Sequence, residues 1–302
     1  MHLLKFLESI RNPVLDAFFS LITHFGAETV FIIVGIAVFW CLNKKHGYYI
    51  LTVGFLGIVA NSFLKMLFRV PRPWVKDPNF TIVESARAEA TGYSFPSGHT
   101  QVSVGLFGVI AKVYKKWVRV LAVALCVLIP LSRLYLGVHT FLDVSVSVLI
   151  ALALIFLVHP LIEKAFEKPK LMRVLFLIMA LFSLSFILFM HFFPFPSDTD
   201  SVNYLDAVEN SYKMFGCILG LMVSFEIDTK FTRFETKAVW WAQILKVVLG
   251  LIPILLIKSL LKEPLLALFN GGNLAGCVRY FLITFFAGGI WPITFKWFSK
   301  AK

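Results

Sequence analysis

A histidine and an aspartate in this chain are spaced for nucleophilic chemistry. His139 and Asp143 are four residues apart, so on a helix they share one face about 6 Å apart. The carboxylate can accept a hydrogen bond from one ring nitrogen, which fixes the tautomer and leaves the other nitrogen as a nucleophile. Such a pair is costly in an apolar segment unless it is used, and the alternative is a buried structural pair.

A second histidine, His99, directly follows Pro96, Ser97 and Gly98 at the start of an apolar run. Pro96 biases its predecessor away from helix, and Ser97 suits the N-cap of a helix that begins near Gly98. The free N–H groups and the dipole of such an end attract phosphate, and Gly98 lets an anion approach the backbone. His99 then lies on the first turn, facing whatever binds. A plain capped helix with an interfacial histidine is the alternative.

Three cations lie within eight residues: Lys65, Arg69 and Arg72. Lys65 is about one turn inside an apolar run, where an unpaired cation is costly. Pro71 and Pro73 stiffen the chain after the run. Together the three cations favour an anion at a membrane boundary, although a lysine that snorkels from a helix end would also explain Lys65.

Composition sets the class of protein that must position these groups. The 302 residues are 59% hydrophobic, with a mean hydropathy of +0.82. Apolar runs approach or exceed the roughly 20 residues that span a bilayer. The sequence therefore predicts an all-α, polytopic transmembrane helix bundle. Up to nine spans are expected, at 25–42, 48–68, 98–114, 118–136, 139–160, 171–194, 207–225, 239–261 and 274–298.

The N-terminal segment and the cysteines contribute less to the functional prediction. Residues 1–24 have apolar positions at helical spacing opposite a polar side, which predicts an amphipathic interfacial helix or the front of a tilted first span. The four cysteines all lie in apolar runs, without metal-ligand spacing, and we assign them no function.

Charge predicts the orientation in the membrane. The net charge of +12 is not gathered into one tract, which argues against nucleic acid as a partner. One set of loops and the C-terminal tail carry more than half of the Lys and Arg, so this face should be cytoplasmic and the loop 69–97 should face outward. These basic residues are Lys44, Lys45, Lys112, Lys115, Lys116, Arg119, Lys164, Lys168, Lys170, Arg173, Lys230, Arg233, Lys237, Lys296, Lys300 and Lys302.

Taken together, the three clusters resemble the signature of the type-2 phosphatidic acid phosphatase superfamily, which includes glucose-6-phosphatase and vanadium haloperoxidases. That signature reads K-x6-R-P, then P-S-G-H, then S-R-x5-H-x3-D. All eleven fixed positions are present in order. They are Lys65, Arg72 and Pro73; Pro96, Ser97, Gly98 and His99; and Ser132, Arg133, His139 and Asp143.

The resemblance implies a mechanism without a metal or other cofactor. His139 would attack phosphorus and form a phosphohistidine, oriented by Asp143, and His99 would protonate the leaving alcohol and then activate water. Three cations would clamp the phosphate oxygens, helped by backbone N–H groups near Ser97 and Gly98. The cations are Lys65, Arg72 and Arg133.

The resemblance also implies a domain plan: an interfacial helix at 1–24, a six-span catalytic core at 25–194, and about three further spans of unknown role at 195–302. The expected setting is a bacterial plasma membrane, with the active site outside and the C-terminus in the cytoplasm.

The expected substrate is a lipid phosphate or diphosphate that enters from the outer leaflet. Candidates are phosphatidic acid, phosphatidylglycerol phosphate, undecaprenyl diphosphate, a sphingoid-base phosphate and lipid A phosphate. Three alternatives stay open: a sugar-phosphate phosphatase of the glucose-6-phosphatase type, a lipid phosphotransferase, and a transporter or scaffold that binds an anion without turnover.

Overall fold

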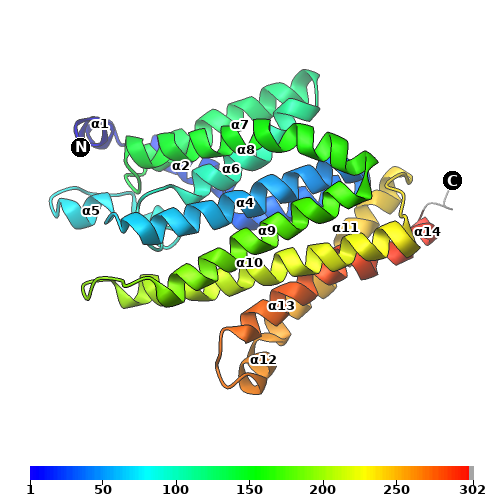
Figure 1. Cartoon of the computed structure of the whole chain (residues 1–302). Helices are drawn as coiled ribbons and strands as arrows, with labels where there is room; N and C mark the ends of the chain where they lie inside the picture. The colour runs from blue at the N-terminus through cyan, green and yellow to red at the C-terminus, as the bar shows by residue number, and fades with distance from the viewer. Residues whose placement is uncertain (299–302) are drawn as a thin grey trace. The chain divides into compact units, whose positions relative to one another are not determined.

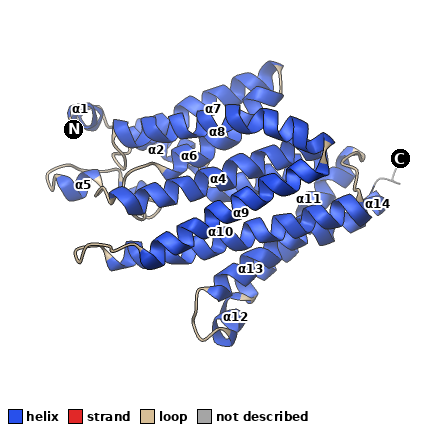
Figure 2. Cartoon of the chain, viewed as in Figure 1, coloured by secondary structure: helices blue, strands red, loops and turns tan. Residues whose placement is uncertain are grey.

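The computed structural model describes residues 1–298, and within this range it consists of helices and loops without a strand (Figures 1 and 2). The all-α prediction is confirmed. The helices are α1 (His2–Ser9), α2 (Pro13–His24), α3 (Glu28–Ala37), α4 (Lys44–Phe68), α5 (Pro73–Lys76), α6 (Gly98–Val113), α7 (Lys116–Tyr135), α8 (Phe141–Glu167), α9 (Pro169–Phe192), α10 (Ser201–Ile227), α11 (Trp240–Leu260), α12 (Lys262–Leu268), α13 (Leu274–Phe285) and α14 (Phe295–Phe298). Short 3-10 or π-helical segments are η1 (Val38–Leu42), η2 (Glu84–Ala86), η3 (Asp228–Thr232), η4 (Phe286–Ile290) and η5 (Trp291–Thr294).

Helices occupy all nine ranges that the apolar runs predict. Six helical segments of the described chain are long and apolar enough to cross a membrane, or seven if α2 forms one bent span with residues 28–42. Besides 25–42, which meets this standard only together with α2, two predicted spans do not meet it. Helix α6 has only 16 residues, and α10 carries Glu209 and Lys213, which lower its hydropathy.

Two compact units divide the chain. The first unit comprises Met1–Ile33, Leu56–Val158 and Phe195–Asp206, and the second comprises Val34–Phe55, His159–Pro194 and the chain from Ala207 on. Helices α4 and α8 each contribute to both units. All the chemistry predicted from the sequence falls in the first unit.

The N-terminal segment of the first unit forms two helices where one amphipathic helix was expected. Asn12 breaks the segment, because its side chain accepts hydrogen bonds from the N–H groups of Val14 and Leu15 and so caps α2. Helix α1 buries Leu4 against Phe80 and its neighbours. Part of the apolar side of this segment therefore faces protein.

In the second unit, close helix packing depends on two glycines of α10. Gly216 and Gly220 are four residues apart on one face, in contact with α13. A Cβ atom at Gly216 would collide with the carbonyl group of Cys277, and one at Gly220 would collide with Thr284 and the carbonyl oxygen of Phe281. Small residues at this spacing let two membrane helices approach closely.

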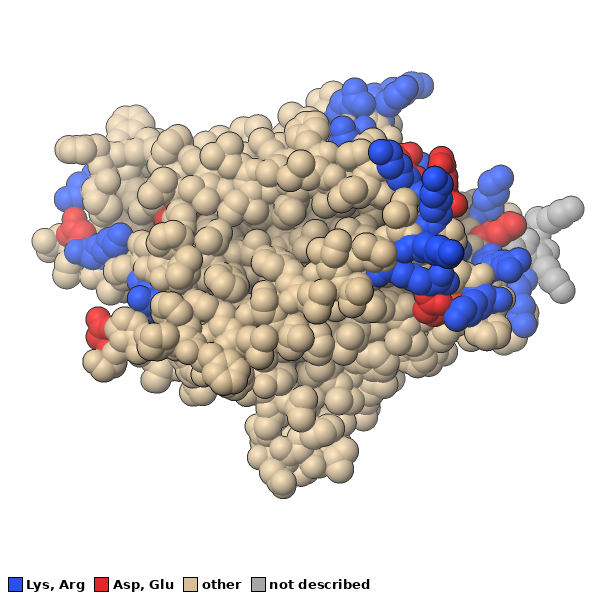
Figure 3. All heavy atoms as spheres, in the orientation of Figure 1, with Lys and Arg blue, Asp and Glu red and all other residues tan. Residues whose placement is uncertain are grey.

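The second unit also has many Lys and Arg side chains where its helices begin and end, and Figure 3 shows the Lys and Arg side chains in blue. Ion pairs join the helix ends there: Lys44 to Asp228 at 2.7 Å, Lys45 to Glu163 at 2.8 Å and Arg173 to Glu226 at 2.5 Å. The beginnings of α4 and α9 therefore lie beside the ends of α8 and α10. Lys300 and Lys302, which the charge analysis assigns to the same face, lie outside the described residues.

Candidate active site

The first unit brings together the side chains that the three motifs single out. The cations of Lys65, Arg72 and Arg133 all act electrostatically on the His139 ring, as does His99. These groups come from the last turn of α4, the residues after it, the N-terminus of α6, the last turn of α7, and the loop into α8. Gly137, with a φ of +81°, lets the chain turn from α7 towards His139.

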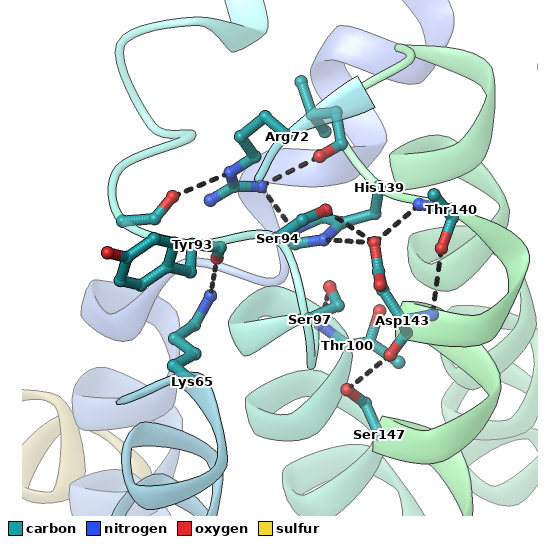
Figure 4. Close-up of polar contacts among 12 residues, drawn as sticks. Lys65, Arg72, Tyr93, Ser94, Ser97, Thr100, His139, Thr140, Asp143 and Ser147 are labelled. Atoms are coloured by element: carbon teal, nitrogen blue, oxygen red, sulfur yellow. Dashed lines mark hydrogen bonds and ion pairs between the residues drawn. The ribbon is translucent and has the colours of Figure 1, made fainter. Parts of the chain in front are cut away.

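The Nε2 atom of His139 lies 2.9 Å from Nη1 of Arg72 (Figure 4). A guanidinium group only donates hydrogen bonds, so Nε2 must present its lone pair and the ring proton must sit on Nδ1. That atom faces Oδ2 of Asp143 at 3.6 Å, slightly beyond hydrogen-bond range. The tautomer that these neighbours favour therefore has its free lone pair on Nε2.

Asp143 is held in place by the way α8 begins. Its Oδ2 atom accepts a hydrogen bond from the N–H of Thr140 at 2.7 Å, and its own N–H donates to Oγ1 of Thr140 at 3.3 Å. This reciprocal pair is a capping box, which satisfies N–H groups in the first helical turn. The hydroxyl of Ser94 also donates to Oδ2, at 2.6 Å. The carboxylate is thus fixed before any substrate binds.

Arg72 is held by backbone carbonyl groups of the loops around it. Its guanidinium donates to the carbonyl oxygens of Gly92 at 3.0 Å, Val138 at 2.9 Å and Thr91 at 2.5 Å. Only 6% of the residue is exposed. These contacts connect the loop after α4 to the loop that carries His139.

Arg133 and Lys65 have fewer of their N–H donors paired with protein groups than Arg72 has. Arg133 is fully buried, and its Nη1 donates to Oγ1 of Thr23 at 2.6 Å. Its Nε and Nη2 atoms are buried without a hydrogen-bond partner, although buried donors are normally paired. The Nζ atom of Lys65 donates to the carbonyl oxygen of Tyr93. Unpaired guanidinium donors suit a phosphate, whose oxygens accept such bonds in pairs.

Arg69, the third cation of its cluster, has a different role. It adopts a left-handed conformation with a φ of +48°, and its Nη1 donates to the carbonyl oxygens of Met66 and Leu67. The side chain therefore caps the C-terminus of α4 and also lies over the Phe195 ring. We do not count it among the phosphate ligands.

Ser97 begins α6 as its sequence predicts, since its hydroxyl accepts a hydrogen bond from the N–H of Thr100 at 3.4 Å. The N–H of Ser97 itself donates to the carbonyl oxygen of Asp143 at 3.2 Å. That N–H was expected to bind phosphate, and the structure instead uses it to join α6 to α8. A Cβ atom at Gly98 would make an ordinary contact of 3.9 Å with Oδ1 of Asn61.

The partner of His99 is a residue that the sequence did not predict. The Nε2 atom of His99 lies 3.2 Å from Oε2 of Glu89, and Oε1 of the same carboxylate lies 3.1 Å from Nδ1 of His24. The hydrogen bond from His99 lowers the pKa of Glu89 to about 2, so this carboxylate is ionised at neutral pH. Glu89 belongs to no motif, and no local pattern in the loop marks it.

Burial and charge act on His139 in the same direction. The ring is only 2% exposed. Burial holds the pKa of His139 well below its ordinary value, and the positive charges of Arg72 and Arg133 lower it further. At neutral pH this imidazole is uncharged, as a nucleophile must be.

Within residues 1–298, no group of three or more His, Cys, Asp or Glu side chains could hold a metal ion.

Comparison with known protein families gives two matches along the chain. Residues 45–167, which hold all three motifs, match the PAP2 superfamily. Residues 212–302 match a transmembrane extension of PAP2 superfamily phosphatases. The second match covers the part of the chain to which the sequence analysis assigns no role. No solved structure matches the chain.

Individual relatives agree with these matches. Phosphatidylglycerophosphatase B of Bacillus subtilis is 30% identical over 51% of this chain and 79% of its own length. An undecaprenyl-diphosphatase of the same organism is 30% identical over 49% of this chain and 76% of its own length. Sphingosine-1-phosphate phosphatase 1 of Mus musculus is 24% identical over 85% of this chain and 62% of its own length.

Helices long enough to cross a bilayer, together with this site, define a class of membrane-bound phosphatases. The chain belongs to the PAP2 superfamily. It is an integral membrane protein of a family of lipid phosphatases, and the resemblance found in the sequence is confirmed.

Proposed function

We propose that this protein hydrolyses a lipid phosphate or diphosphate through a phosphohistidine on His139, without a metal ion. The observation that carries the proposal is the placement of the His139 ring, with Arg72 at Nε2 and Asp143 at Nδ1. A site that only binds an anion needs cations, but it does not need a buried neutral imidazole with a carboxylate behind it.

The reaction has two steps. Nε2 of His139 bonds to phosphorus while the bond to the leaving oxygen breaks, and that oxygen keeps the electron pair and takes a proton from His99. Asp143 stabilises the positive charge that develops on the attacking ring. Water then attacks phosphorus and gives a proton to His99, the P–N bond breaks, and inorganic phosphate leaves.

The phosphate oxygens would be held by Lys65, Arg72 and Arg133. Arg133 supports this role most strongly, because two of its nitrogen atoms are buried without partners. Binding of a phosphate would draw Arg72 from the ring nitrogen of His139 to an oxygen, which frees the nucleophile as the electrophile arrives. The charge that grows on the oxygens during transfer is then met by cations already in place.

The pH dependence of the rate tests the roles of the two histidines. We expect a bell-shaped profile for kcat/KM, because His139 must be neutral and His99 protonated. Since burial and nearby cations lower the pKa of His139, activity should persist on the acid side below the ordinary imidazole value of about 6.5. Initial rates of phosphate release between pH 4 and 10 would measure this, and a flat profile would contradict the assignment.

Chelation tests the metal-free mechanism and ranks substrates in one experiment. We expect the purified protein in detergent with EDTA to keep its rate of phosphate release, because three side-chain cations supply the charge that Mg²⁺ supplies in other phosphoryl transfers. The panel should contain a phosphatidylglycerol phosphate, a sphingoid-base phosphate, undecaprenyl diphosphate and glucose 6-phosphate. A strong preference for glucose 6-phosphate would favour the sugar-phosphate alternative, and loss of activity restored by Mg²⁺ would refute the metal-free step.

We further propose that the site faces the extracytoplasmic side and that the C-terminus is cytoplasmic. In the first unit, α6 and α7 both have one end at the site and the other end at a basic loop that contains Lys115 and Lys116. The positive-inside rule assigns such a loop to the cytoplasm. The other end, with His99 and Arg133, then lies outside, as the bacterial plasma membrane setting requires.

This orientation predicts which sites an impermeant thiol reagent labels. In a background with the four native cysteines replaced by serine, Asp198→Cys should be labelled in intact cells. Lys116→Cys should be labelled only after the membrane is opened, because the bilayer excludes the reagent. Labelling in the opposite order would reverse the assigned topology.

A further inference from the structure

The last turn of α2 and the residue pair that follows it lie against the active site. Thr23 is buried, and its Oγ1 atom accepts the hydrogen bond from Arg133 at 2.6 Å. His24 lies 3.1 Å from Glu89. Gly26 packs so closely against the site that a Cβ atom there would lie 3.4 Å from the His99 ring. Thr23, His24 and Gly26 all precede the range 45–167 that matches the PAP2 superfamily.

Glu89 links this turn to His99 through both of its oxygens. Oε2 lies 3.2 Å from Nε2 of His99, and Oε1 lies 3.1 Å from Nδ1 of His24. The side chains become more exposed along this row, from 18% for His99 to 32% for Glu89 and 61% for His24. Two imidazoles thus hold one carboxylate, which fixes its position between the site and the surface.

The charges around His99 explain why a carboxylate is needed there. Burial lowers the pKa of His99, the charges of Arg133 and Arg72 lower it further, and Glu89 is the anion that opposes these effects. With Nε2–H donated to Glu89, Nδ1 is the nitrogen that remains for the leaving oxygen. Asp143 lies 3.6 Å from Nδ1 of His139, so each imidazole of the site has a carboxylate facing its second nitrogen.

We propose that the last turn of α2 is part of the active site, where His24 and Glu89 hold His99 as the proton donor and Thr23 holds Arg133 on the phosphate. The inference rests on the proposed function. It adds three positioning residues, Thr23, His24 and Glu89, to a site that the motifs place wholly within residues 65–143.

The test separates the proton-donating role of Glu89 from a structural one by using two leaving groups. Glu89→Gln keeps the shape of the side chain and removes its charge. Single-turnover rates are measured on an alkyl lipid phosphate, whose alkoxide needs a proton to leave, and on p-nitrophenyl phosphate, whose phenolate does not. We expect a loss of about 10²-fold on the alkyl substrate and a much smaller loss on the aryl substrate.

This ratio of rates does not depend on the fraction of protein that is folded, because both substrates see the same preparation. The alkaline limb of the pH profile for the alkyl substrate should also move to lower pH in Glu89→Gln. His24→Asn should shift both quantities in the same direction by a smaller amount. A wild-type ratio together with a wild-type pH profile in Glu89→Gln would overturn the proposal.

The role of Thr23 is tested by measurements of substrate and inhibitor binding. Thr23→Val should raise KM and weaken inhibition by orthovanadate about 10-fold, because Arg133 loses the partner of its Nη1 atom. Thr23→Ser keeps the hydroxyl and should restore both values. Failure of Thr23→Val to change KM or vanadate inhibition would remove Thr23 from the site.

Two matched controls lie beside these residues without touching the site. Ser20→Ala removes the hydrogen bond from α2 to Ser85 at 2.7 Å, and Glu84→Gln removes the exposed pair with Arg87 at 2.7 Å. Both should behave as wild type. His139→Ala, measured in parallel, tests the mechanism itself: if it stays active the proposed function fails, whereas inactive His139→Ala beside a wild-type Glu89→Gln refutes only the present inference.

Discussion

Replacing His139 with alanine is expected to abolish turnover and to leave phosphate-analogue binding nearly intact. The substitution removes the atom that bonds to phosphorus, and direct attack by water would have to replace a covalent step. We expect kcat to fall by about 10⁴-fold or more. Lys65, Arg72 and Arg133 remain to bind orthovanadate, so its dissociation constant should change by less than about 10-fold, as judged by protection against thermal unfolding.

A second histidine serves as the control for His139→Ala. His191→Ala removes an imidazole in the second unit, where Nε2 of the ring lies 3.1 Å from the Tyr212 hydroxyl, and it should keep wild-type turnover. Rapid quenching at alkaline pH with substrate labelled in its phosphate should trap a phosphoprotein in the wild type and none in His139→Ala. Turnover by His139→Ala within a factor of ten of wild type would end the phosphohistidine proposal.

The second large effect is expected from Asp143→Asn, which keeps size and shape. The Thr140 N–H and the Ser94 hydroxyl both donate to Oδ2 of the carboxylate, and Nδ1 of His139 faces the same atom. The amide oxygen should therefore take the Oδ2 position, which keeps these contacts and removes the negative charge. The positive charge that develops on the His139 ring during attack is then no longer stabilised by a carboxylate, and kcat should fall by about 10³- to 10⁴-fold.

A variant of the neighbouring residue separates this effect from the loss of the helix cap. Thr140→Ala removes the hydroxyl that accepts from the Asp143 N–H and keeps the backbone N–H that fixes the carboxylate. It should lower the free energy of unfolding by about 1 kcal/mol and change kcat by less than tenfold. If Thr140→Ala lost as much activity as Asp143→Asn, loss of the helix cap and not loss of the carboxylate charge would explain both.

Sequence predicts the membrane helices well where apolar runs are long. Helices α7, α9 and α11 each begin and end within about two residues of the predicted spans, because burial in lipid leaves the backbone no alternative to helix. The N-terminal segment was harder. Its amphipathic period continues through Asn12 and Pro13 and so hides the break between α1 and α2. These two residues are the local signal for that break, because asparagine favours the N-cap and proline favours the first position of a helix.

For the site, fixed spacings located the groups, and only tertiary structure reveals their partners. The His139–Asp143 spacing predicted a shared helical face, whereas the structure places His139 in the loop before α8 and Asp143 in the first turn. Glu89 and His24 lie 65 residues apart in sequence, so no motif could join them. Arg69 looked equivalent to its cationic neighbours, because its left-handed backbone is invisible in the sequence.

In the capping box at the start of α8, the carboxylate of Asp143 has two functions. The Oδ2 atom of Asp143 closes the first turn of the helix and also faces the His139 ring. Most substitutions at position 143 should therefore lower both the cellular abundance of the protein and its activity. Asparagine and glutamate should separate these two effects, since each can still close the turn, while asparagine lacks the charge and glutamate displaces it from His139.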